Sequence, residues 1–223
     1  MKIIARIHND FPEKFGVPRQ SGLVPELEAI IVFEPEYRNI DALKGLEGFS
    51  HIWLIWEFSE AVRDTWSPTV RPPRLGGEKR LGVFATRSPF RPNPIGLSSV
   101  KLERIELDSK LGPVLHISGA DLMDGTPIYD IKPYLAYADC HKDAAGGFAE
   151  AFVGYGLDVV IPDEYMEQIP ANKREALLGV LAQDPRPSYQ NDPERVYGIT
   201  FGKQNIKFRV AHNVLTVIDI TSM

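Results

Sequence analysis

The segment from Pro68 to Gly96 gathers the residue types that bind anionic ligands. It holds six prolines and four glycines, so its backbone is stiff in some places and free of Cβ atoms in others. A proline-pinned connection with solvated arginines is the plain alternative. A connection this long with few strand residues is, however, more often functional than neutral. We therefore expect a shaped binding loop in this part of the chain.

The charge of the chain is segregated around this loop. The 223 residues carry a formal net charge of −5, whereas residues 71–104 contain eight basic and two acidic side chains, a net charge of +6. Such segregation produces a local positive field that can hold phosphates although the whole chain is acidic. The alternative is that these arginines pair with the acidic remainder.

Familiar catalytic motifs do not occur in the sequence. It has no GxGxxG after a strand, no Walker P-loop, no HExxH and no GxSxG. The five histidines never pair at ligand spacing, so we expect no metal site. Cys140 and His141 form a candidate thiol and base, but sequence neighbours point apart on a strand.

The cellular setting follows from the cysteine count and the apolar runs. The single cysteine, Cys140, excludes an intramolecular disulfide and favours a reducing, cytoplasmic location. No apolar run exceeds five residues, far below the roughly 20 that span a bilayer. We expect no membrane partner.

The first 160 residues read mainly as strands. A phase slip near Glu103 and Arg104 predicts a β-bulge. No long helical period interrupts the series, so a βαβ sheet is disfavoured and a mainly β fold with an antiparallel β-barrel is predicted for residues 1–160. The predicted strands are 2–8, 26–33, 51–58, 81–85, 97–107, 114–118 and 128–131.

The composition changes after Pro162. Asp163 is predicted to cap a short helix over 164–169, and Asn172 a second helix over 173–182 that Asp184-Pro185 ends. Three further strands are predicted at 196–201, 206–210 and 214–220. Residues 161–223 therefore read as a small α+β C-terminal domain.

Seven blocks of residues, taken in order, carry a resemblance that runs nearly from end to end. They are VPRQSG (17–22), GFSHIW (48–53), RPPRLGG (71–77), GVFATRS (82–88), FRPNPIG (90–96), DGTP (124–127) with DIKPY (130–134), and LAQDPRP (181–187). Together they resemble the bacterial tRNA methyltransferase O family.

The resemblance implies a specific chemistry. Members of this family are S-adenosylmethionine-dependent methyltransferases on a β-barrel, outside the Rossmann-like class. They methylate N6 of threonylcarbamoyl-adenosine beside the anticodon of tRNA, and they act as homodimers with the cofactor near the subunit interface. The missing glycine-rich nucleotide motif therefore does not argue against S-adenosylmethionine.

The resemblance also implies which residues contact the cofactor. An arginine suits the methionine carboxylate, an apolar wall suits the adenine, and Asp121 or Glu60 can offset the sulfonium charge. His8-Asn9-Asp10 departs from the Arg-Ser-Pro that commonly follows the first strand, which leaves the role of that loop open. The implied cofactor contacts are Pro18, Arg19, Gln20, Ser59, Glu60, Arg87, Leu97, Ser118, Gly119, Ala120 and Asp121.

The expected reaction is a direct displacement at the methyl carbon. N6 of threonylcarbamoyl-adenosine is a poor nucleophile until its proton leaves, so a base is needed. The candidate bases are Asp184, Asp130 and Tyr134. Arg186 could clamp the threonyl carboxylate or a phosphate, unless the Asp-Pro-Arg-Pro turn only ends a helix and ties two domains together.

The remaining expectations concern the substrate and the rival functions. The tRNA contacts predicted are Arg91, Asn93, Lys132 and Tyr189, the last by stacking on a base of the anticodon loop. The alternative functions are a non-catalytic module that binds S-adenosylmethionine or RNA, since no unmistakable acid–base pair is present, and a methyltransferase that acts on a small molecule.

Overall fold

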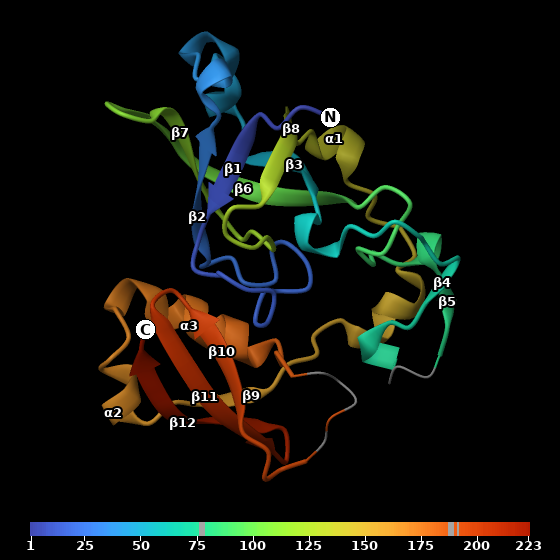
Figure 1. The fold of residues 1–223 in the computed structure, drawn as a ribbon, viewed down its shortest axis with the longest axis vertical. Coiled ribbons are helices and arrows are strands. Elements are labelled where there is room, and N and C mark those ends of the chain that lie inside the picture. Colours follow the sequence, from blue (N-terminus) through green and yellow to red (C-terminus); the bar gives the residue numbers. More distant parts are fainter. Residues whose placement is uncertain (76–78, 187–189, 191) are drawn as a thin grey trace.

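A computed structural model describes residues 1–75, 79–186, 190 and 192–223 of the chain. Most of its regular structure is β-strand, arranged as a ring of strands above a smaller sheet that is flanked by helices (Figure 1). This agrees with the mainly β fold predicted from the sequence. No helix in these residues is long and apolar enough to cross a membrane.

Six strands close into an antiparallel barrel in the order β1-β2-β7-β6-β3-β8. The predicted phase slip is confirmed, because the register of β6 with β7 shifts between Leu102 and Arg104. The strands are β1 Ala5–His8, β2 Glu28–Phe33, β3 His51–Glu57, β6 Ile95–Asp108, β7 Gly112–Ser118 and β8 Pro127–Pro133.

Alternation along each strand decides which side chains fill the barrel. In β3, Ile52, Leu54 and Trp56 are buried, whereas Trp53 and Ile55 are only partly covered. Successive side chains of a strand point to opposite faces, so one set lines the interior and the other lies on the outer wall. The same alternation decides which candidate site residues point into the barrel and which point outward.

A two-stranded sheet of β4 (Thr69–Val70) and β5 (Leu81–Gly82) lies outside the ring (Figure 1). The strand predicted over 81–85 is wrong beyond Gly82, because Val83–Ala85 form a 3-10 turn. The amide and the hydroxyl of Thr86 both donate to the carbonyl of Val83, which bends the chain there. A short apolar run without alternation was no evidence for a longer strand.

The C-terminal sheet has the order β10-β11-β12-β9, with β9 parallel to β12. Sequence analysis missed β9, since three residues are too short to show an alternation. Its elements are β9 Asp158–Val160, α2 Asp163–Met166, α3 Arg174–Ala182, β10 Tyr197–Phe201, β11 Gln204–Ala211 and β12 Val214–Ser222, preceded by α1 Ala136–Asp139.

Both predicted helix caps are wrong. Asp163 is already the first residue of α2, and Pro162 is its N-cap. Asn172 lies in a 3-10 turn, Ala171–Lys173, that follows Pro170 and leads into α3. In both places the N-cap residue is a proline, whose φ is fixed and whose side chain accepts no hydrogen bond, so no side-chain cap forms.

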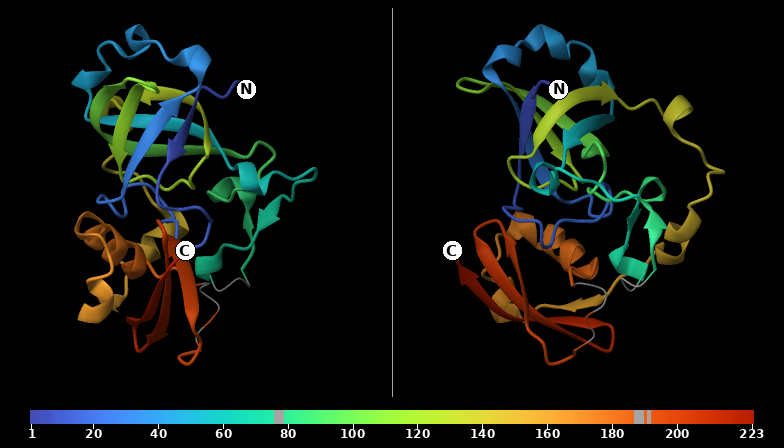
Figure 2. Two further views of the ribbon diagram at one scale, coloured as in Figure 1. Left: turned by 60° about the vertical axis from the view of Figure 1, so that its left-hand side comes forward. Right: turned by 45° about the vertical axis from the view of Figure 1, so that its right-hand side comes forward.

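Two hydrophobic cores hold the fold together. One fills the barrel, and the other packs α3 against β10, β11 and β12. Phe11, Val24 and Leu27, from the connection between β1 and β2, belong to this second core. The connection therefore runs between the barrel and the C-terminal sheet (Figure 2). The predicted division near residue 160 stays a prediction.

The contact between Val24 and α3 can be tested with Gly179. A Cβ atom at Gly179 would lie 2.6 Å from Cγ1 of Val24. We expect Gly179→Ala to lower the free energy of unfolding by about 1–3 kcal/mol through overpacking, although alanine is the better helix former. Gly48→Ala, which meets no neighbour, should stay within about 0.5 kcal/mol. Urea denaturation measures both, and a fully stable Gly179→Ala would show that the connection does not pack on α3.

Candidate functional site

A partly buried carboxylate, Asp121, lies just beyond the end of β7. The hydroxyl of Ser98 donates to its Oδ1 over 2.6 Å, and Nε1 of Trp56 donates to the Ser98 hydroxyl over 2.9 Å. Burial raises the pKa of Asp121, while hydrogen bonds from Ser98 and the Ser21 amide and the charge of Arg87 partly offset the rise. Because burial penalises its charged form, the carboxylate gains from a cation nearby, such as Arg87 or a cationic ligand.

Two glycines allow this arrangement. A Cβ atom at Gly96 would lie 2.2 Å from the indole ring of Trp56, so only glycine lets the ring lie over β6 and reach Ser98. Gly119 adopts a φ of 76°, a conformation that favours glycine. Its carbonyl accepts from the amide of Gly22 at 2.8 Å, and its amide donates to Leu27 at 2.9 Å. The loop that carries Pro18–Gln20 is thereby held against the segment that carries Asp121.

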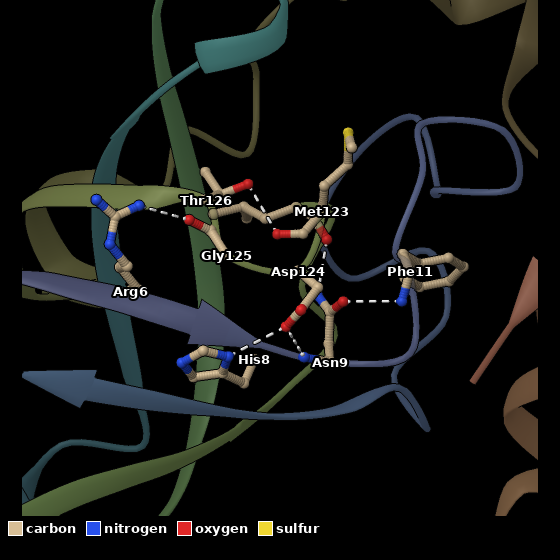
Figure 3. A network of polar contacts seen from close by, with 9 residues as sticks. Arg6, His8, Asn9, Phe11, Met123, Asp124, Gly125 and Thr126 are labelled. Atoms are coloured by element: carbon tan, nitrogen blue, oxygen red, sulfur yellow. Dashed lines mark hydrogen bonds and ion pairs between the residues drawn. The ribbon is translucent and has the colours of Figure 1, made fainter. Parts of the chain in front are cut away.

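The Asp-Gly-Thr-Pro block anchors the other end of this segment (Figure 3). Oδ1 of Asp124 accepts from the amide of Asn9 at 3.1 Å and lies 3.2 Å from Nδ1 of His8. The Asn9 side chain donates to the Leu122 carbonyl at 2.7 Å, and Arg6 donates to the Gly125 carbonyl at 3.0 Å. Although His8-Asn9 departs from the family pattern, these residues position the loop from Asp121 onward.

The structure brings three of the predicted cofactor residues into one chain of hydrogen bonds. Arg87 donates to the side-chain oxygen of Gln20, whose amide in turn donates to the Arg19 carbonyl. The guanidinium of Arg19 donates to the Arg186 carbonyl at 3.4 Å. Pro18 is buried beneath this turn. The charge of Arg87 also acts on Asp121, so these contacts lead from the turn to the partly buried carboxylate.

Asp184 and Arg186 form a tight pair at the end of this chain. Nε and Nη2 of Arg186 lie 2.8 and 3.0 Å from the two Asp184 oxygens, and the Tyr155 hydroxyl donates to Asp184 at 2.8 Å. Burial alone would raise the pKa of Asp184, but the bonds from Arg186 and Tyr155 hold it below its usual value. The Asp184 backbone has a φ of 52°, which the pair stabilises.

This geometry argues against two of the predicted roles. Both oxygens of Asp184 are occupied by strong donors, so the carboxylate is unsuited to accept a proton from substrate. The side chain of Arg186 is only 11% exposed and already faces a carboxylate, which leaves little of it for a threonyl carboxylate or a phosphate. The alternative reading of the Asp-Pro-Arg-Pro turn, as a tie between parts of the chain, fits the contacts better.

The predicted residues of β8 lie on the outer wall of the barrel. Oδ2 of Asp130 is 2.9 Å from Nζ of Lys132, and the ring of Tyr134 lies 5.4 Å from that of Trp53. Asp130 lines a pocket of about 470 Å³ that also includes Tyr37 and Tyr129. These groups therefore face away from the interior side chain of Ser98, to which Asp121 is bonded.

The side chains of Leu97 and Ser118 also lie apart from that of Asp121. Leu97 points outward from β6 and is 57% exposed, one residue before the buried Ser98. It faces Ile55 across the strands, on the same outer wall as Asp130. The hydroxyl of Ser118 donates to Glu103 at 2.7 Å and lines an acidic pocket of about 330 Å³. Within one chain, the side chains of Leu97, Ser118 and Asp121 are therefore poorly placed to contact the same cofactor molecule.

The other predicted contacts range from the exposed Ser59, Glu60 and Asn93 to the partly buried Arg91 and the buried Ala120. Ser59 and Glu60 begin a 3-10 turn that follows β3. The guanidinium of Arg91 is held by the carbonyls of Thr86, at 2.7 Å, and Val83, at 3.3 Å. Asn93 is exposed, and Ala120 is buried in the barrel core. Tyr189 lies outside the described residues.

Sequence analysis missed Trp56 and Ser98. Both lie at inward positions of their strands, where Gly96, Ser98 and Val100 alternate with outward residues. A hydroxyl at an inward position of a barrel strand needs a polar partner, and that was the available signal. Within the described ranges, no group of three or more His, Cys, Asp or Glu side chains is arranged to hold a metal ion.

Comparison with known proteins gives the same family over most of the chain. Residues 6–140 match the family model of the tRNA-methyltransferase O N-terminal domain, and residues 156–223 match that of the TrmO C-terminal domain.

Relatives and solved structures agree with these matches. A tRNA (adenine(37)-N6)-methyltransferase of Escherichia coli is 42% identical over 215 residues, which is 93% of this chain and 91% of that protein. A putative S-adenosylmethionine-dependent methyltransferase, RcsF, of Pseudomonas aeruginosa is 40% identical and covers 97% of this chain and 95% of its own length. The crystal structure of TrmO from Pseudomonas aeruginosa superposes with a TM-score of 0.78 at 34% identity, covering 99% of this chain and 97% of that one. This chain therefore belongs to the tRNA-methyltransferase O family.

Proposed function

We propose that this protein methylates N6 of an adenosine in tRNA with S-adenosylmethionine as the methyl donor, and that the adenosine is threonylcarbamoyl-adenosine next to the anticodon. The Escherichia coli relative is named for tRNA adenine-N6 methylation, and the Pseudomonas aeruginosa relative for S-adenosylmethionine dependence. The observation that carries the proposal is the meeting of Arg87, the Arg19-Gln20 turn and the partly buried Asp121 at one end of the barrel.

The residues at this end fit the charges of the cofactor. S-adenosylmethionine, when bound, supplies a methyl group on a cationic sulfonium. Asp121 offers a partly buried carboxylate whose charged form is penalised by burial, so it gains from a nearby cation. Arg87 and Arg19 offer guanidinium groups to a carboxylate at the other end of the same ligand. The bond from Arg19 to the Arg186 carbonyl holds the Arg19 side chain in place.

The proton on N6 needs a separate acceptor. Burial and the nearby Cys140 and Asp139 raise the pKa of Tyr134, so at neutral pH its phenol donates a hydrogen bond and does not act as a base. Asp184 is occupied by Arg186 and Tyr155. Of the three candidate bases, Asp130 is the one we propose, and Nζ of Lys132 lies 2.9 Å from its Oδ2.

A homodimer is part of the proposal. Asp130 and Leu97 lie on the outer wall of the barrel, away from Asp121 in the same chain. In a homodimer, the outer wall of one subunit can face the barrel end of the other. The exposed Leu97 and Ile95 give that wall the apolar surface that an interface needs.

The reaction is tested by methyl transfer. Purified protein should move a labelled methyl group from S-adenosylmethionine to tRNA that carries threonylcarbamoyl-adenosine, and not to the same tRNA made without that modification. The modification must be confirmed in the substrate by mass spectrometry. Tight cofactor binding without any transfer would point to a non-catalytic module, and transfer that is insensitive to tRNA would point to a small-molecule substrate.

Measurement of the free energy of unfolding tests whether Arg186 ties parts of the chain together. Arg186→Ala leaves Asp184 buried without its partner, so we expect a loss of about 3 kcal/mol in the free energy of unfolding at pH 7. Because the pKa of Asp184 is depressed in the folded protein, its stabilisation is present above about pH 4 and disappears as the pH falls through the lower folded value. The difference in the free energy of unfolding between wild type and Arg186→Ala should therefore become smaller in acid.

Arg209→Ala is the matched control for this experiment. Arg209 pairs with Glu194 at 3.9 Å, and both side chains are well exposed. A surface pair of this kind contributes about 0–1 kcal/mol, so the control should unfold nearly as the wild type does. An Arg186→Ala variant as stable as Arg209→Ala would contradict the structural role of the pair.

A further inference from the structure

We propose that an exposed aromatic surface next to β4 and β5 binds unstacked bases of a single-stranded RNA loop. This Trp66–Phe84 surface consists of Trp66 and Phe84, with Arg91 beside Phe84. The proposal rests on the proposed tRNA substrate and adds the part of the protein that holds its loop. Trp66 and Phe84 are 52% and 72% exposed, which is unusual for side chains of this size and polarity.

The two rings are held side by side by the backbone. Trp66 precedes β4 and Phe84 follows β5, and these strands pair antiparallel through Thr69 with Gly82. The amide of Val83 donates to the Pro68 carbonyl at 2.9 Å, which extends the pairing toward the rings. The ring centroids lie 6.2 Å apart with an interplanar angle of 30°. Both rings thus keep open surface on which a flat base can stack.

Guanidinium groups accompany the aromatic rings. The guanidinium of Arg91 lies 5.8 Å from the Phe84 centroid and is fixed by the carbonyls of Val83 and Thr86. That of Arg63 lies 3.7 Å from the centroid of Phe90. Arg80 is tied to the Thr69 hydroxyl at 3.2 Å. Cations placed over or beside aromatic rings in this way offer charge to phosphates while the rings take bases.

The charge of the segment selects the kind of partner. Residues 63–91 contain seven basic and two acidic side chains, a net charge of +5 in a chain whose total is −5. Phosphates complement this charge, and exposed flat bases complement Trp66 and Phe84. A duplex hides the faces of its bases, whereas a hairpin loop presents them. The partner that satisfies both features is a single-stranded loop of RNA.

The same loop connects the surface to the candidate cofactor site. Arg87, three residues after Phe84, donates to Gln20 and acts on Asp121. A base stacked on Phe84 would therefore lie close along the chain to a residue of that site. This connection gives a physical reason why the basic residues and the exposed rings occur in one segment.

The experiment measures binding of an RNA stem-loop with the sequence of an anticodon arm to the full-length protein. Trp66→Ala and Phe84→Ala should each raise the Kd by about 5- to 100-fold, the range for loss of one base–aromatic stack. Because phosphate contacts remain, the dependence of the Kd on salt should be unchanged. In methyl transfer, the KM for RNA should rise and kcat at saturating RNA should be retained.

Leu107→Ala is the matched control. Leu107 is 71% exposed near the end of β6, at the opposite side of the barrel from β4 and β5 (Figure 1). It should leave the Kd unchanged. An independent readout uses tryptophan fluorescence, since Trp66 is the most exposed of the three tryptophans. Addition of the stem-loop should quench the wild type and quench Trp66→Phe much less.

The outcomes separate this inference from the proposed function. Wild-type protein that transfers no methyl group to modified tRNA would overturn the proposed function, while stem-loop binding still reports on the surface. Wild-type methyl transfer together with unchanged Kd values in Trp66→Ala and Phe84→Ala would overturn the inference alone. Equal weakening in Leu107→Ala would overturn it as well. A shift in the monomer–dimer equilibrium of both variants without RNA would instead assign the surface to a contact between two copies of the chain.

Discussion

The arrangement of this protein depends on one partly buried carboxylate. Asp121 lies at the end of the barrel, where burial raises its pKa and hydrogen bonds from the Ser98 hydroxyl and backbone amides offset part of that rise. Ser98 is in turn oriented by Trp56, whose ring fits over Gly96. Each of these features is explicable as support for a negative charge away from water, which is costly unless hydrogen bonds or a cation compensate it.

The Asp184–Arg186 pair is a second feature that holds the site together, and it acts through the residues between it and Asp121. Its two close hydrogen bonds fix the backbone that follows α3, and the Arg186 carbonyl then accepts from Arg19. Arg19 and Gln20 belong to the β1–β2 connection, whose apolar residues Phe11 and Val24 pack in the C-terminal core. The C-terminal part of the chain thus positions residues of the barrel end and need not supply the reacting groups itself.

The sequence predicted the strands well because alternation is a local property. The bulge beside Glu103 and the apolar side of α3 could both be read from neighbours in the chain. The composition of the site was harder to predict, since a shift of one residue sends a side chain to the opposite face of a strand. Leu97 and Ser98 illustrate this. The resemblance to the family implied that Leu97 and Asp121 contact the same cofactor, but Leu97 points outward from its strand and the next residue, Ser98, is buried. Trp66 and Phe84 are far apart in sequence, and only the pairing of β4 with β5 brings them together.

The central claim is that Asp121 provides the charge that recognises a cationic cofactor. Calorimetry of wild type and Asp121→Asn with S-adenosylmethionine and with S-adenosylhomocysteine, which lacks the sulfonium charge, tests it directly. The amide keeps the size of the carboxylate, so the Kd for S-adenosylmethionine should rise by about 10-fold or more, while that for S-adenosylhomocysteine should change within about twofold. Equal weakening for both ligands, or no weakening for S-adenosylmethionine, would contradict the claim.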